Sequence, residues 1–203
     1  MIWQWLLDNY IEVLGALTGL IYLYFSLNQI IWLWLLGIIT SALYIFVFFN
    51  SGLYADMGLQ VYYLIISVYG WIHWLKGGKT EKNPEEKNAK LPVSSLKRKY
   101  IIALIVITGI MTILLGMLLS EIKNSSIPYW DAFTTSGSII ATWMLARKYI
   151  ENWIFWIIID LIAMGTYVYK GLYPTVILFF VYTLMAVIGY IEWKKDLIKK
   201  QSE

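Results

Sequence analysis

The segment GLYADMGLQVYYLIISVYGWIHW at residues 52–74 recurs in altered form as GLYPTVILFFVYTLMAVIGYIEW at residues 171–193. The match extends without a gap from 34–74 to 153–193, an offset of 119 residues, and 12 of the 41 aligned positions are identical. Shared Ile and Leu are common in any two apolar segments, but shared Gly, Tyr and Trp are harder to obtain by chance. The pattern predicts a duplicated unit, and chance similarity between two hydrophobic hairpins is the alternative.

The composition around this pattern is typical of an integral membrane protein. Of the 203 residues, 60% are apolar, and the mean hydropathy of +0.64 is far above that of a soluble domain. The net charge of +3 provides no basic field for nucleic acid. The absence of cysteine excludes disulfides and thiolate chemistry. We therefore expect a multi-pass membrane protein whose partners include the lipid bilayer and no nucleic acid.

Seven segments are apolar enough to cross a bilayer as helices, which takes about 17 to 25 residues each. The offset of 119 residues covers four crossings, so both copies enter the membrane in the same direction. This predicts an all-α fold of seven transmembrane helices in a parallel 3+1+3 repeat, a plan known from transporters whose site lies between the halves. The predicted spans are 11–27, 30–49, 54–75, 99–120, 129–146, 152–169 and 172–193.

The spans divide the chain and orient it in the membrane. With seven crossings, 14 of the 16 Lys and Arg residues fall on one side, which the positive-inside rule assigns to the cytoplasm. The N-terminus is then outside and the C-terminus cytoplasmic. We expect an interfacial N-terminal segment (1–10), a first three-helix repeat (11–75), a cytoplasmic linker (76–98), a linking helix (99–120), a second three-helix repeat (129–193) and a cytoplasmic tail (194–203).

Positions where the two copies differ are candidates for the binding site, because a small asymmetric ligand needs an asymmetric pocket. Each pair joins a polar or bulky residue to an inert one: Trp156 with Gly37, Asp160 with Ser41, Gln60 with Phe179, and Asp56 with Thr175.

Helical spacing places the candidates on two faces. One face carries Trp153, Trp156 and Asp160, and the other carries Asp56, Gln60, Tyr63 and Ser67. Asp160 stands near the middle of its span, where a carboxylate costs about 2.5 to 3.5 kcal/mol on insertion scales and is expected to be functional. Two tryptophans beside a carboxylate suit a flat cationic ligand. The alternatives are an interface-anchor role for Trp153, and for Asp160 either a structural hydrogen bond or proton coupling.

The sequence lacks the elements of an enzyme or of a nucleotide-driven pump. We find no Ser–His pair, no cluster of metal-ligating residues and no phosphate-binding loop, so we expect no cofactor and no metal site. The parallel-repeat architecture therefore points to a membrane transporter.

Three segments carry a resemblance to a known family. The segments GLYADMGLQVYYLIISVYGWIHW (52–74), PYWDAF (128–133) and MLARKYIENWIFWIIIDLIAMGTYVYKGLYPT (144–175) resemble the Pnu family of vitamin transporters, and the similarity covers essentially the whole chain. The resemblance implies a SWEET-like fold, a homotrimer and facilitated diffusion that a cytoplasmic vitamin kinase drives by trapping the substrate. It also implies a pocket that uses Trp153 and Trp156 of the WxxW motif, Gln60, and the position of Asp160.

Departures from the family's nicotinamide riboside branch (PnuC) guide the expected substrate. That branch has Asn where Asp160 and Ser67 stand, and Asp56 adds an acid. The sequence therefore looks closer to the thiamine branch (PnuT), and we expect a thiamine transporter of the bacterial inner membrane. A nicotinamide riboside transporter is the alternative, and a vitamin-binding subunit of an ATP-driven transporter is a further one.

Overall fold

A computed structural model describes residues 10–50, 54–77, 91–121 and 127–202 of the chain, and in these ranges the fold is all-helical. Side chains are described for residues 16–50, 57–77, 91–121 and 127–199. The helices are α2 (Tyr10–Leu27), α3 (Trp32–Asn50), α4 (Tyr54–Lys76), α5 (Arg98–Glu121), α6 (Pro128–Ala146), α7 (Asn152–Tyr169) and α8 (Tyr173–Ser202). Residues 1–9 of the predicted N-terminal interfacial segment and most of the predicted linker lie outside the described residues.

Local sequence signals explain several helix ends. Pro128 opens α6 at a position where no backbone N–H is needed. After α7, Gly171 adopts a φ of +72°, the left-handed conformation that commonly ends helices. By contrast, α8 continues past residue 193 to Ser202, so the segment expected as a tail is the last part of this helix.

Four of the described helices are long and apolar enough to cross a membrane by length and composition alone: α3, α5, α7 and the Tyr173–Lys199 part of α8. This supports a multi-pass membrane protein, but it is fewer than the seven predicted spans. The helices α4 and α6 have sufficient length, 23 and 19 residues, but several of their polar side chains line the interior cavities described below.

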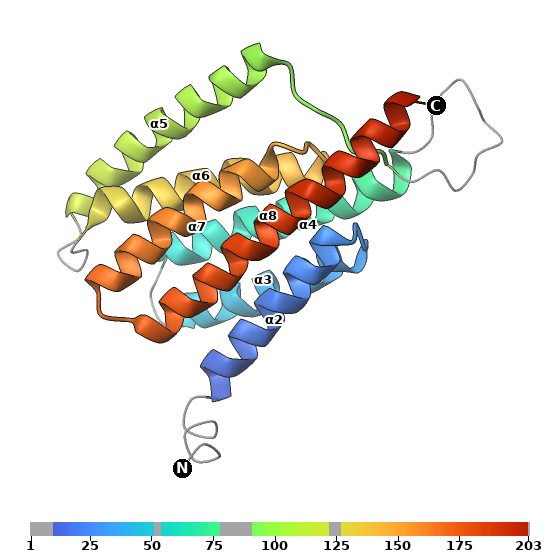
Figure 1. The fold of residues 1–203 in the computed structure, drawn as a ribbon. Coiled ribbons are helices and arrows are strands. Elements are labelled where there is room, and N and C mark those ends of the chain that lie inside the picture. The colour runs from blue at the N-terminus through green and yellow to red at the C-terminus, as the bar shows by residue number, and fades with distance from the viewer. Residues whose placement is uncertain (1–9, 51–53, 78–90, 122–126, 203) are drawn as a thin grey trace.

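The helices pack side by side in an elongated bundle (Figure 1). Helix α3 packs against α4, α7 against α8, and α6 against α7. Helix α2 contacts α8, and α4 contacts α6. Helix α5 lies at the periphery along α6, and its outer face is rich in exposed Ile and Leu.

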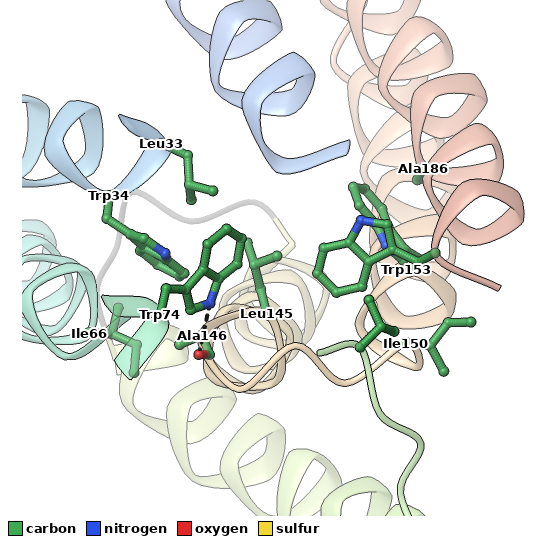
Figure 2. Close-up of a cluster of buried hydrophobic side chains, with 11 residues drawn as sticks. Leu33, Trp34, Ile66, Trp74, Leu145, Ala146, Ile150, Trp153 and Ala186 are labelled. Atoms are coloured by element: carbon green, nitrogen blue, oxygen red, sulfur yellow. Dashed lines mark hydrogen bonds between the residues drawn. The ribbon is translucent and has the colours of Figure 1, made fainter. Parts of the chain in front are cut away.

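Four buried tryptophans, Trp34, Trp74, Trp153 and Trp193, form what we call the tryptophan cluster, part of which Figure 2 shows. Trp34 and Trp74 meet edge to face with ring centroids 5.5 Å apart and an interplanar angle of 88°. Trp153 and Trp193 meet at 5.5 Å and 90°. The geometry is therefore the same at positions that differ by 119 residues.

Two glycines allow this packing. A Cβ atom on Gly70 would lie 2.5 Å from the Trp34 ring, and one on Gly189 would lie 2.6 Å from the Trp153 ring. Because these contacts are tighter than van der Waals distance, the backbone of each helix approaches its tryptophan only where the residue has no side chain.

The chain that leads into α5 is attached to the α6–α7 turn. The Ser94 N–H donates to the Lys148 carbonyl at 3.0 Å, and the Ile150 N–H donates to the Ser94 carbonyl at 3.0 Å. The Glu151 carboxylate accepts hydrogen bonds from the Ser95 hydroxyl at 2.5 Å and the Leu96 N–H at 3.0 Å. The end of the predicted linker thus packs against the bundle.

Candidate substrate-binding cavities

A cavity of about 400 Å³, which we call the first cavity, lies among α2, α4, α6, α7 and α8. Asp160, whose residue surface is 5% exposed, contributes to its wall. Among the described residues that line this cavity, Asp160 is the only acidic or basic one. Trp156, Tyr63 and Tyr182 also line it, so the chamber combines aromatic side chains with one carboxylate. Such a wall suits a flat cation of small-molecule size.

A second cavity of about 300 Å³ lies among α2, α3, α4, α6 and α7. Gln60, Ser67, Ser41 and Thr40 give it a neutral, polar wall. The two cavities share three lining residues, Tyr22, Tyr63 and Trp156, which therefore stand at the boundary between them.

The offset of 119 residues relates the walls of the two cavities. Every residue that α3 and α4 contribute to the second cavity has its counterpart in the wall of the first. The second-cavity residues are Gly37, Thr40, Ser41, Tyr44, Gln60, Tyr63 and Ser67, and their counterparts are Trp156, Ile159, Asp160, Ala163, Phe179, Tyr182 and Ala186. The shape of the cavities thus follows the internal match, whereas their chemistry differs.

The structure places six of the seven predicted site residues in these walls. Trp153, Trp156, Asp160 and Tyr63 line the first cavity, and Gln60, Ser67, Tyr63 and Trp156 line the second. Asp160 and Gln60, predicted to act in one pocket, therefore stand in adjoining cavities. The side chain of Asp56 lies outside the described residues.

Trp153 differs from Trp156 in its surroundings. Trp153 is 1% exposed and packs against Gly189 and Trp193, as Trp34 packs against Gly70 and Trp74. Trp156 is only partly buried and touches both cavities. This arrangement favours a packing role for Trp153 and leaves Trp156 as the side chain available to a ligand.

Several residues with hydroxyl groups line the first cavity, although the sequence reasoning did not select them. They are Tyr22, Ser26, Thr134, Thr135, Ser138, Tyr167 and Tyr182. Tyr182 was not selected, although it matches Tyr63, which was selected from its place on the face with Gln60 and Ser67. Residues that line corresponding cavities in the two copies occupy corresponding positions. The match with the selected Tyr63 was therefore a signal that could have identified Tyr182.

The described residues hold no group of three or more His, Asp or Glu that could bind a metal ion. The cavities offer aromatic side chains, hydroxyl groups, an amide and one carboxylate. These groups suit reversible binding of a polar aromatic ligand by stacking and hydrogen bonding.

Comparisons with known proteins agree with this picture. The profile of the family described as "Nicotinamide mononucleotide transporter" matches residues 9–195, so the chain belongs to that family. The chain is 25% identical to the nicotinamide riboside transporter PnuC of Escherichia coli, covering 91% of this chain and 85% of that protein. It is also 25% identical to the riboflavin/roseoflavin transporter RibM of Streptomyces davaonensis, covering 90% of this chain and 83% of that protein.

A solved structure, "Crystal structure of the Vitamin B3 transporter PnuC", has the same fold with a TM-score of 0.73. The sequences are 21% identical, and the superposition covers 98% of this chain and 86% of that one. The predicted resemblance to the Pnu family is confirmed. The chain is a membrane transporter and not an enzyme.

Proposed function

We propose that the chain, as a member of this transporter family, carries nicotinamide riboside across the membrane by facilitated diffusion. Relatives from Escherichia coli, Neisseria mucosa and Haemophilus influenzae are named for that substrate. They support the alternative from the sequence analysis better than they support thiamine, which was our first expectation.

The observation that carries this proposal is the first cavity. Nicotinamide riboside consists of a flat pyridinium cation with an amide and a ribose that has several hydroxyl groups. Trp156 and Tyr182 offer aromatic surfaces to the ring, and Asp160 offers a negative charge. The cavity volume of about 400 Å³ lies in the range of small-molecule sites, about 300 to 1,000 Å³.

Purified protein in liposomes provides the direct test. Labelled nicotinamide riboside is expected to equilibrate across the membrane without ATP and without an imposed pH gradient, because the proposal is facilitated diffusion. Tight binding without transport would instead identify a binding subunit. Transport that requires a proton gradient would overturn facilitated diffusion and leave the substrate assignment standing.

Thiamine is the second candidate, and Asp160 favours it. The aminopyrimidine of thiamine donates hydrogen bonds, and a carboxylate accepts them more strongly than an amide does. The thiazolium ring is also a flat cation. Uptake of labelled thiamine, nicotinamide riboside and riboflavin, each measured separately, distinguishes the candidates, because only the true substrate is expected to be taken up. Uptake of thiamine alone would reverse the assignment.

The internal match supports a parallel 3+1+3 repeat of the SWEET type, with α2–α4 and α6–α8 as the repeated units and α5 as the linking helix. The two tryptophan pairs have the same geometry, and the cavity walls use corresponding residues. Backbone turns also correspond: the Ile30 N–H donates to Phe25 O at 2.8 Å, and the Tyr149 N–H donates to Met144 O at 3.0 Å. Chance similarity would not reproduce contacts of this kind at one constant offset.

The setting of the transporter is part of the proposal. The bundle end that holds the C-terminus of α8 faces the cytoplasm by the positive-inside rule, in the inner membrane of a bacterium. Three copies form a homotrimer, and a cytoplasmic kinase that phosphorylates the vitamin maintains net uptake. Cross-linking in the membrane tests the trimer, and retention of label in cells with and without the kinase tests the coupling.

A further inference from the structure

We propose that the contacts joining the α2–α3 turn to the α6–α7 turn form the gate through which the substrate leaves the cavities toward the cytoplasm. The two turns lie at the same end of the bundle, the end that also holds the C-terminus of α8. The inference rests on the proposed function only for the identity of the substrate and for the side that this end faces.

A buried lysine makes the central contact. Lys148 in the α6–α7 turn is 2% exposed, and its ammonium donates a hydrogen bond to the Gln29 side-chain carbonyl at 2.8 Å. The same Nζ atom lies 4.3 Å from the centroid of the Trp74 ring. The Gln29 amide in turn donates to the Asp196 carboxylate at 2.6 Å. One cation thus connects α4 and the two turns, and Gln29 extends the connection to α8.

Two tryptophans add a reciprocal pair of bonds across the halves. The Trp74 indole N–H, from α4, donates to the Ala146 carbonyl at the end of α6 at 3.1 Å, which Figure 2 shows as a dashed line. The Trp193 indole N–H, from α8, donates to the Leu27 carbonyl at the end of α2 at 3.1 Å. The last helix of each half therefore holds the first helix of the other half at this end.

These contacts lie between the first cavity and the cytoplasmic end of the bundle. Leu145 and Trp153 line the cavity and also belong to the buried cluster that contains Trp74 and Trp193. Ser26 and Leu145 line the cavity three residues before Gln29 and Lys148 respectively. A substrate that moves from the cavity toward this end therefore has to separate the two turns.

The backbone at both turns is in an unfavourable conformation. Gln29 has a φ of 54° and Lys148 a φ of 53°, the left-handed region that non-glycine residues rarely adopt. Such residues persist where surrounding contacts hold them, and they cluster at switches. The Gln29–Lys148 hydrogen bond joins the two strained residues directly, so opening this bond releases both turns together.

A cross-linking experiment tests whether the contact opens during transport. The natural chain has no cysteine, so a Gln29→Cys/Lys148→Cys variant carries only the two introduced thiols. In liposomes loaded with labelled nicotinamide riboside, a cleavable bifunctional thiol linker is expected to lower transport by about tenfold or more, with ligand binding retained and transport restored on cleavage. Full transport by the linked protein would overturn the gate.

A matched control places the linker on one helix. Glu192 and Lys195 form an exposed pair within α8, with their charged atoms 2.6 Å apart. The Glu192→Cys/Lys195→Cys variant, linked in the same way, is expected to transport at the rate of the natural protein. Loss of transport in both linked variants would show that the linker blocks transport wherever it is attached. That result would count against the proposed gate.

A second measurement needs no substrate. Ser26→Cys is introduced alone and treated with a membrane-impermeant thiol reagent from the cytoplasmic side of inside-out vesicles. Adding Lys148→Met is expected to raise the rate of labelling several-fold, because the apolar side chain cannot bond Gln29. Unchanged labelling would overturn the gate even if the double-cysteine variant is inactive before linking. If no vitamin is transported, the proposed substrate fails while this measurement still decides on the gate.

Discussion

Replacing Asp160 by asparagine removes the charge from the first cavity and keeps the size of the side chain. Because Asp160 lines a cavity of about 400 Å³, a cationic ring bound there has room to lie close to the carboxylate. Two unit charges about 5 Å apart attract by about 3 kcal/mol at an effective dielectric constant of about 20. Desolvation of the carboxylate on binding offsets part of this attraction. A net loss of about 1.4 to 2.8 kcal/mol raises Kd by about 10- to 100-fold.

The assay is a calorimetric titration of the natural and Asp160→Asn proteins with nicotinamide riboside and with its reduced form. The reduced compound has nearly the same size but lacks the positive charge. The substitution is expected to weaken binding of the cation and to leave binding of the reduced form nearly unchanged. Asp160→Glu, which keeps the charge, serves as the control and is expected to show a smaller loss.

An equal loss for both ligands would refute the electrostatic reasoning, because a charge effect cannot act on an uncharged ring. No loss for either ligand would assign Asp160 to a structural hydrogen bond. Thermal unfolding of each variant in the same detergent shows whether a lower affinity follows from a less stable fold.

Further substitutions separate binding from packing. Trp156→Ala is expected to weaken substrate binding by about tenfold with an unchanged Tm, since Trp156 is only partly buried and touches both cavities. Trp153→Ala is expected to lower Tm, because truncating a buried tryptophan costs about 3 to 5 kcal/mol; an unchanged Tm would contradict its packing role. Gly189→Ala is expected to cost about 1 to 3 kcal/mol through its clash with Trp153, measured by thermal unfolding. Gly165→Ala, where a Cβ meets nothing within 4 Å, is the control and is expected not to lower Tm.

The positions of the helices could be predicted closely, because the length of each apolar segment and the residues at its turns can be read from the local sequence. The predicted span 152–169 coincides with α7 (Asn152–Tyr169), and the predicted span 129–146 begins one residue after α6 (Pro128–Ala146). The continuation of α8 to Ser202 was missed, because its last residues, Lys194 to Ser202, are mostly charged or polar. A criterion based on hydropathy detects only the apolar part of a helix.

The site could be predicted only in part, because the internal match gives pairs of corresponding positions and does not give their location within the bundle. It indicated Trp156 and Asp160, which differ from their counterparts. It did not indicate that Gln60 and Asp160 line separate cavities. The spacing of residues along each helix does not give the distance between the two helices. The buried position of Lys148 was also hidden, because a lysine in a short turn after Arg147 is typical of an exposed cytoplasmic loop.

The two halves correspond in one way at the end of the bundle and in another way in the cavities. This difference suggests that separate parts of the fold serve movement and ligand binding. At the bundle end that holds the C-terminus of α8, buried tryptophans match across the halves in type and geometry, as the Trp34–Trp74 and Trp153–Trp193 pairs do. In the cavities, position corresponds but chemistry does not. A symmetric closure lets both halves rock by the same motion, whereas an asymmetric wall favours one orientation of the ligand. Substitutions at the closure should therefore alter transport rate more than affinity, and substitutions at Asp160 should alter affinity first.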